Sequence, residues 1–172
     1  MALDNTPGGA SANTYATIAE ADAYLATRPG ASAWATLSDP VKEAALITAC
    51  RLMDRTLPWN LVSIGYERSS TTQALIFPRP YTLNAAGDAY LAGVPTFAKE
   101  AQSEWAFALT VSDRLADSTT RGIAGITAGP LSIDFDPATS GQQNFTPEYV
   151  YFLLAPWLLS RSALGSVAIA RA

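Results

Sequence analysis

The segment 15–59 constrains the fold more than any other part of the sequence, because it holds two helix patterns joined by a turn that bears an aromatic residue. Thr17 precedes an apolar-periodic run and Glu20 follows three residues later, which is the spacing of a capping box. A Pro-Gly pair at 29–30 stops the run. These signals predict a first helix over 17–28.

A second helix is predicted over 39–57. Ser38 or Asp39 can cap its free N–H groups, and Pro40 is tolerated in the first turn. Five residues at helical spacing form one stripe that we expect to be buried against further helices: Leu46, Ala49, Cys50, Met53 and Leu57.

Three polar or reactive side chains of this second helix have predicted roles. Arg51 and Asp54 stand three residues apart, so we expect them to pair on the face opposite the apolar stripe. Cys50 lies on the stripe, which favours a packed thiol over a nucleophile. It is also the only cysteine, so no disulfide can form within the chain, as in proteins of a reducing cytoplasm.

The segment 59–94 shows no sustained helical period and is predicted to be a long loop. Residues 75–77 suit a short strand or an extended packing segment, and the prolines at 78 and 80 favour an extended path. Long loops in compact domains are usually functional or disordered. We therefore expect a contact surface here.

A long helix is predicted from Pro95 to about residue 116. Its apolar positions spread over more than one side, which is typical of a helix at the centre of a bundle or in a subunit interface. The apolar positions are Phe97, Ala101, Trp105, Phe107, Ala108, Val111 and Leu115, and the remaining face is expected to carry Lys99, Glu100, Glu104 and Asp113.

Residues 121–136 change to a period near two, with a Gly-Pro turn at 129–130, and predict a β-hairpin or paired extended arms. A lone hairpin is seldom stable, so we expect it to rest on the bundle or on another subunit. Thr146 at the N-cap and Pro147 at the first helical position predict a last helix over 147–159. The segment 160–172 is predicted to be an extended tail.

Size and charge bound the class of protein. A chain of 172 residues with 49% apolar composition can bury one core, so we expect a single domain over 1–172 with a flexible N-terminus over 1–14. The fold class is mainly α: a bundle of about four helices with a small β-hairpin and an extended tail. The net charge of −4 gives no footprint for general nucleic-acid binding. Because no signal peptide is evident and the most apolar stretch, 149–159, is too short to cross a bilayer, we expect a soluble intracellular protein.

The residues that most enzymes need are missing. Without histidine there is no Ser-His-Asp triad, no Cys-His pair and no His-containing metal site, and no P-loop or GxGxxG motif occurs. Glu100 and Glu104 lie one helical turn apart, where a solvated face is favoured over a metal site. Asp134 and Asp136 could hold a hard cation, although protection of an exposed strand edge is favoured. We expect no enzymatic activity, no metal and no cofactor.

Several segments, in order and within 15–136, resemble the head–tail connector (adaptor or head-completion) proteins of tailed bacteriophages, which are often labelled DnaT-like. Each segment is a weak signal by itself, and their common order carries the resemblance. They are Thr17–Leu25, Trp34 before Leu37-Ser38-Asp39, Lys42–Leu46, Arg51–Arg55, Gln73–Arg79, and Val94-Pro95 leading into Lys99–Gln102.

The resemblance implies a virion protein of the head–tail junction, made in the host bacterial cytoplasm. Copies would form a dodecameric ring under the portal protein, extend the channel through which packaged DNA passes without sequence-specific binding, and dock the next neck or tail protein. We expect the isolated protein to be monomeric or weakly associated. No membrane is involved. The tail would bind the portal through Arg161, Leu164, Val167, Ile169, Arg171 and Ala172, and the subunit or neck contacts would be Phe77, Arg79, Tyr81, Ile126, Leu131 and Phe135.

Two alternatives remain. A DnaT-like single-stranded DNA-binding module would need stacked aromatics beside a basic groove. Tyr24, Arg28 and Trp34 are the candidates, although Asp22, Asp39 and Glu43 dilute positive charge there. The other alternative is a different neck component, such as a stopper or tail-completion protein, which is more often rich in β-structure.

Overall fold

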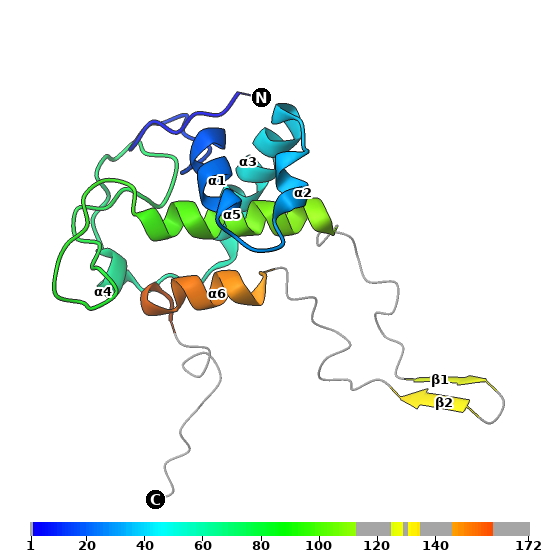
Figure 1. Ribbon diagram of the computed structural model, residues 1–172. Helices are drawn as coiled ribbons and strands as arrows, with labels where there is room; N and C mark the ends of the chain where they lie inside the picture. The colour runs from blue at the N-terminus through cyan, green and yellow to red at the C-terminus, as the bar shows by residue number, and fades with distance from the viewer. Residues whose placement is uncertain (1, 113–124, 129–130, 135–145, 160–172) are drawn as a thin grey trace, which may run out of the picture.

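The computed structural model describes residues 2–112, 125–128, 131–134 and 146–159. Its body consists of helices, and the described strands form one antiparallel pair (Figure 1). This confirms the predicted mainly α fold with a small hairpin. The larger helices are α1 (Ile18–Ala26), α3 (Asp39–Thr56), α5 (Thr96–Val111) and α6 (Glu148–Leu154); the shorter elements are α2 (Ser32–Ala35), α4 (Leu61–Ile64), the 3-10 turn η1 (Ala155–Trp157), β1 (Gly125–Ala128) and β2 (Leu131–Asp134).

Helix α5 lies at the centre of the bundle and packs against α3, α6 and α1. Its Ala101, Trp105 and Phe107 are buried, as its wide apolar face predicts for a central helix. The five stripe residues of α3 are also buried, and Cys50 is among them as a packed thiol. The hydrophobic core therefore forms where α3 and α5 cross.

Helices α1 and α3 begin where the sequence predicts, but not every predicted capping hydrogen bond is present. The capping box of α1 is present: Glu20 N–H donates to Thr17 Oγ1 at 3.1 Å, and Thr17 N–H donates to the Glu20 carboxylate at 2.8 Å. Helix α3 has Ser38 at its N-cap, but the Ser38 side chain makes no capping bond. The last helix is predicted over 147–159 with Thr146 at the N-cap, but the N-cap is Pro147. The helix begins at Glu148 and passes into η1 at Ala155.

Two predictions about polar helix faces are wrong. Asp54 does not pair with Arg51 but is half-buried and accepts hydrogen bonds from Tyr15 Oη and Ile76 N–H. Glu104 does not face solvent but is buried and accepts from Arg28. Helical spacing shows which residues share a face, whereas the segments that cover that face come from elsewhere in the chain.

The segment 59–94 is held by the bundle rather than loose. Residue Phe77 is buried, as an extended packing segment requires, and its ring meets those of Tyr15, Trp59 and Phe97 edge-on with centroids 5.2 to 5.8 Å apart. The Phe77-Pro78 peptide bond is cis. The segment also contains the short helix α4, which the sequence did not predict.

The two ends of the described chain are tied to this segment. In the N-terminal segment 1–14, Ala12 and Thr14 are buried, and Ala74 N–H donates to Gly9 O at 3.1 Å. At the other end, Leu158 pairs with Trp59. The segment 160–172, predicted to be a tail, lies outside the described residues.

The hairpin pairs Ile126 with Ile133 and Ala128 with Leu131. Its strands contact each other and lie apart from the helices (Figure 1). The expected support from the bundle is therefore not seen for the described strands. The predicted turn at 129–130 lies outside the described residues.

Candidate interaction surfaces

Five exposed apolar or aromatic side chains gather on α4 and the loop that follows it, and we name them the tyrosine surface: Leu61, Val62, Tyr66, Tyr81 and Tyr90. The Tyr81 and Tyr90 rings meet edge-on with centroids 5.6 Å apart. Gly65, next to Tyr66, packs against Tyr81 so closely that a Cβ at residue 65 would lie 3.1 Å from Tyr81 Cβ. The exposed fractions of Val62, Tyr66 and Tyr90 are 67%, 71% and 65%.

Arg79 fixes the loop beneath the tyrosine surface. Its Nε donates to Ile76 O at 3.0 Å, and its Nη1 donates to Gly65 O at 2.7 Å and to Tyr66 O at 3.0 Å. Burial lowers the pKa of the Arg79 guanidinium. The charge is held inside the loop by backbone carbonyls, and the bonds to residues 65 and 66 fix the backbone that carries Tyr66.

Asp54 attaches the same loop to α3. Its carboxylate accepts from Ile76 N–H at 2.9 Å and from the Tyr15 hydroxyl, which itself accepts from Phe77 N–H at 3.3 Å. Burial raises the pKa of the Asp54 carboxyl, and the bonds from Tyr15 and Ile76 partly offset this rise. Sequence reasoning missed the connection, because Tyr15, Asp54 and Ile76 are far apart in the chain.

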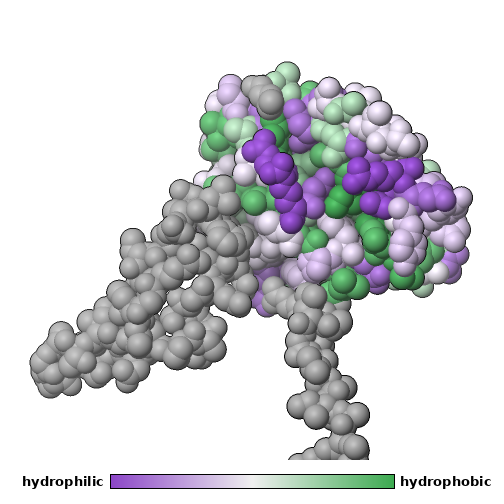
Figure 2. Space-filling model, turned by 180° about the vertical axis from the view of Figure 1, so that it is seen from behind, coloured by the Kyte–Doolittle hydropathy of each residue, from purple (hydrophilic) through white to green (hydrophobic). Residues whose placement is uncertain are grey.

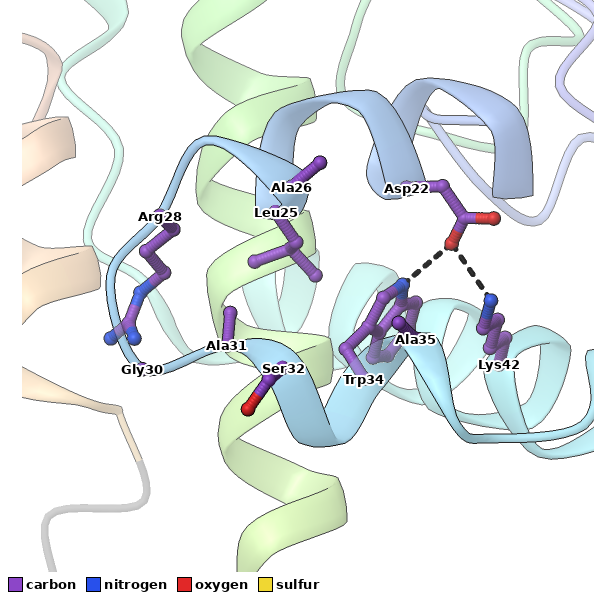
Figure 3. A pocket seen from close by; sticks show the side chains of 10 residues that line it. All are labelled: Asp22, Leu25, Ala26, Arg28, Gly30, Ala31, Ser32, Trp34, Ala35 and Lys42. Atoms are coloured by element: carbon purple, nitrogen blue, oxygen red, sulfur yellow. Dashed lines mark hydrogen bonds and ion pairs between the residues drawn. The ribbon is translucent and has the colours of Figure 1, made fainter.

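A hollow of about 510 Å³ lies between α1, α2 and the start of α3 (Figure 3). Asp22 points from α1 toward Trp34 and Lys42, and one of its oxygens accepts from Trp34 Nε1 at 2.7 Å and from Lys42 Nζ at 2.9 Å. Lys42 Nζ also lies 5.7 Å from the centre of the Trp34 ring. Trp34 is 2% exposed, so its ring is not free to stack on a base.

The other two residues named for DNA binding are also engaged. Arg28 Nε donates to both carboxylate oxygens of Glu104, at 2.7 and 2.8 Å, and the Tyr24 hydroxyl donates to the same carboxylate at 3.3 Å. The Arg28 guanidinium lies over the Phe107 ring at 5.1 Å. These contacts tie α1 to α5, and they leave no aromatic platform beside free positive charge at this hollow.

Outside this hollow, the basic side chains of the described residues do not form a cluster. Lys99 pairs with Glu20 at 2.6 Å. Outside the ion pairs and the buried Arg79, the basic side chains of the described ranges are Arg51, Arg55 and Arg68. Hydrophilic and hydrophobic residues alternate over the face seen in Figure 2. The described ranges contain no group of three or more acidic, Cys or His side chains placed to hold a metal ion.

The predicted contact residues have different positions. Phe77 and Arg79 are buried, 1% and 6% exposed, and serve the interior of the loop; a direct contact with a neighbour does not fit this burial. Tyr81 is exposed and lies in the tyrosine surface. Ile126 and Leu131 lie in β1 and β2, while Phe135 and all six predicted portal-binding residues of 160–172 are outside the described residues.

Within the described ranges, no helix is both long enough and apolar enough to cross a membrane. Comparisons with known proteins give one positive finding. No curated protein and no solved structure matches the chain. A family model described as "Putative DnaT-like ssDNA binding protein" matches residues 1–172. Because that match covers the whole chain, the protein belongs to this DnaT-like family.

Proposed function

We propose that the protein is a structural adaptor of a tailed-bacteriophage neck, without enzymatic activity and without a cofactor. Copies join in a dodecameric ring on the portal protein at the head–tail junction, extend the DNA channel and dock the next neck or tail protein. The DnaT-like part of the resemblance agrees with the family match. The connector part is the proposal, and it rests on the sequence segments and on one structural observation.

That observation is the hairpin β1–β2, whose described strands lie apart from the described helices (Figure 1). A two-stranded hairpin is marginally stable in water unless it rests on a further surface. An element of this kind, placed apart from a closed helical core, suits a protein whose neighbours complete its fold. A ring subunit meets that requirement, because each copy has a neighbour on either side.

The experiment is to mix the purified protein with its cognate portal ring and examine the particles by negative-stain electron microscopy. We expect a second ring on one end of the portal, and a monomeric or weakly associated protein in sedimentation of the free chain. A stable high-order ring without portal would contradict the second expectation. Bare portal rings at saturating protein would overturn the adaptor proposal.

A second candidate function is single-stranded DNA binding, which the description of the family favours. Its residues would differ from those named in the sequence. Tyr66, Tyr81 and Tyr90 are exposed aromatics on which bases could stack, and Arg68 is exposed close by in the chain. Stacking on aromatics next to positive charge is how such modules bind without sequence preference.

The acidic side chains near the exposed tyrosines make single-stranded DNA binding the second candidate rather than the first. Glu67 and Asp88 are exposed in the same loop and oppose Arg68. Fluorescence anisotropy with a labelled oligothymidine at low and raised salt would test it. Binding that weakens steeply with salt and is lost in Tyr90→Ala, with Tyr149→Ala as the control on α6, would establish the DNA-binding function. No binding at low salt would exclude it.

A further inference from the structure

The tyrosine surface is apolar and exposed, and the backbone beneath it is bonded to Arg79. The described chain ends beside it. Leu159 N–H donates to Pro58 O at 2.8 Å, and Asn60 N–H donates to Trp157 O at 2.9 Å. Trp157 Nε1 donates to Leu83 O at 2.7 Å. Residues 157–159 are therefore fixed next to α4, which carries Leu61 and Val62.

The sequence that continues from this point is complementary to the surface. Segment 160–172 carries Arg161 and Arg171 and no acidic residue, together with the apolar Leu164, Val167 and Ile169. The loop of the tyrosine surface carries exposed Glu67 and Asp88 in addition to Arg68. Neither acidic group takes part in an ion pair among the described residues.

Reach and local concentration favour the chain's own segment over other occupants. An extended chain covers about 3.3–3.6 Å per residue, so residues 160–169 can span roughly 30 Å. A segment tethered at the edge of a surface has an effective concentration in the millimolar range, which a free partner rarely reaches. Even weak apolar contacts with the tyrosines then suffice to hold it there.

We propose that segment 160–172 binds the tyrosine surface of its own chain, with Leu164, Val167 and Ile169 against Val62, Tyr66 and Tyr90 and its arginines toward Glu67 and Asp88. Under the adaptor function, a portal that takes up this segment would also uncover the tyrosine surface. The inference itself concerns the free protein and does not depend on that function.

Disulfide trapping in the full-length chain tests the proposal. Val62→Cys is combined with Val167→Cys; the control combines Val41→Cys with Val167→Cys. Val41 is exposed near the start of α3, roughly 25 Å along that helix from the end next to Trp59. The native Cys50 is buried, so it is a poor partner for either introduced pair. At low micromolar protein under mild oxidation, we expect the intramolecular disulfide of the first pair to form at least tenfold faster.

Equal rates for the two pairs would overturn the proposal. A product that is only dimeric, and whose rate depends on protein concentration, would also overturn it, because the segment would then cover a neighbouring copy. A second measurement avoids cysteines. In full-length protein with Leu164, Val167 and Ile169 all changed to Ser, amides of residues 61–66 and 81–91 should exchange hydrogen at least fivefold faster, with α3 unchanged. Unchanged exchange in both regions counts against the proposal.

Neither test contains portal, so a negative result in either one rejects the docking of segment 160–172 without bearing on the adaptor function. Binding of the triple-serine variant to portal rings would be measured in parallel. Loss of portal binding together with equal trapping rates would keep the predicted portal-binding role of 160–172 and reject its docking on the tyrosine surface.

Discussion

The helical bundle and segment 59–94 each contain a buried polar side chain, Gln102 and Arg79, whose hydrogen bonds hold the region together. In the bundle, Gln102 accepts from Tyr15 N–H at 2.9 Å and Ala16 N–H at 3.0 Å, and donates to Thr14 Oγ1 at 2.7 Å and Leu46 O at 2.9 Å. In segment 59–94, Arg79 donates to three backbone carbonyls. Both groups are satisfied, but their partners lie at very different sequence separations.

The partners of Gln102 are 56 to 88 residues away, whereas those of Arg79 are 3 to 14 residues away. Gln102 therefore joins α5, α3 and the chain before α1, and losing it should affect the whole fold. Arg79 closes a local unit. Regions held by local bonds can open without global unfolding, so the two regions should respond differently to mutation.

The largest effect is expected for Gln102→Ala. The change leaves the Tyr15 and Ala16 N–H donors without their buried acceptor and removes one bond each from Leu46 O and from the Thr14 hydroxyl, which still donates to Ala16 O. Each unsatisfied buried group costs about 1–3 kcal/mol. Allowing for relaxation, we expect a loss of about 4 kcal/mol in the free energy of unfolding, measured by urea denaturation. Lys99→Ala on the same helix removes only an exposed ion pair and should cost about 1 kcal/mol or less. Equal midpoints for the two variants would show that Gln102 does not hold the bundle.

A smaller and local effect is expected for Arg79→Lys. Lysine keeps the charge but lacks the planar fork that reaches three carbonyls. We expect hydrogen exchange at the Thr82 and Leu83 amides, which bond Arg79 O and Ser63 O, to rise about tenfold or more, with the urea midpoint nearly unchanged. Arg68→Lys is the matched control, because Arg68 is exposed. If instead the whole bundle exchanged faster, segment 59–94 would not be a separate unit.

The same contrast explains what the sequence could predict. Apolar spacing and the Pro and Ser/Thr residues at helix starts predict helices. The sequence therefore places α1, α3, α5 and the buried stripe of α3 close to where they lie. The hairpin followed from its period of two. Segment 59–94 has no such periodic signal. It is held by bonds from Arg79 to nearby backbone and by individual contacts with distant residues, such as Asp54 and Trp157, and neither leaves a repeating pattern in the sequence.

Tertiary partners account for the errors. The sequence predicts Asp54 and Glu104 as surface residues on amphipathic helices. In the structure Asp54 is half-buried and Glu104 is buried, because Tyr15 and Arg28 from distant segments cover them. Of the predicted contact residues, only Tyr81 lies on the exposed surface that the described side chains form. Hydropathy alone assigns Phe77 and Tyr81 similar roles, and the difference arises from the packing of Phe77 against three other rings.

A third prediction concerns pH at the junction of the two regions. Burial raises the pKa of the Asp54 carboxyl, so the folded state binds that proton more tightly than the unfolded state does. The contribution of Asp54 to stability is therefore fully present below its ordinary pKa of 3.8 and is lost as pH rises through the raised value. We expect the free energy of unfolding of the natural protein, relative to Asp54→Asn, to fall as pH increases above about 3.8. Unfolding midpoints from pH 3.5 to 7 measure this, with exposed Asp88→Asn as the control. A parallel pH dependence in the natural protein and Asp54→Asn would rule it out.

The smallest expected effects on stability are those of removing the N-cap hydroxyls of α1 and α3, which the sequence predicts to be alike. Thr17 and Ser38 both precede a helix and both carry a hydroxyl. Only the Thr17 hydroxyl accepts a bond from its helix, from Glu20 N–H, and Thr17 N–H in turn donates to the Glu20 carboxylate. Thr17→Ala should cost about 1 kcal/mol, whereas Ser38→Ala should cost only a few tenths, because no capping bond is lost. Thermal unfolding of the two variants under identical conditions resolves the difference. Equal losses would mean that Ser38 caps α3 in solution, and that the sequence signal at this helix start is as informative as the one at α1.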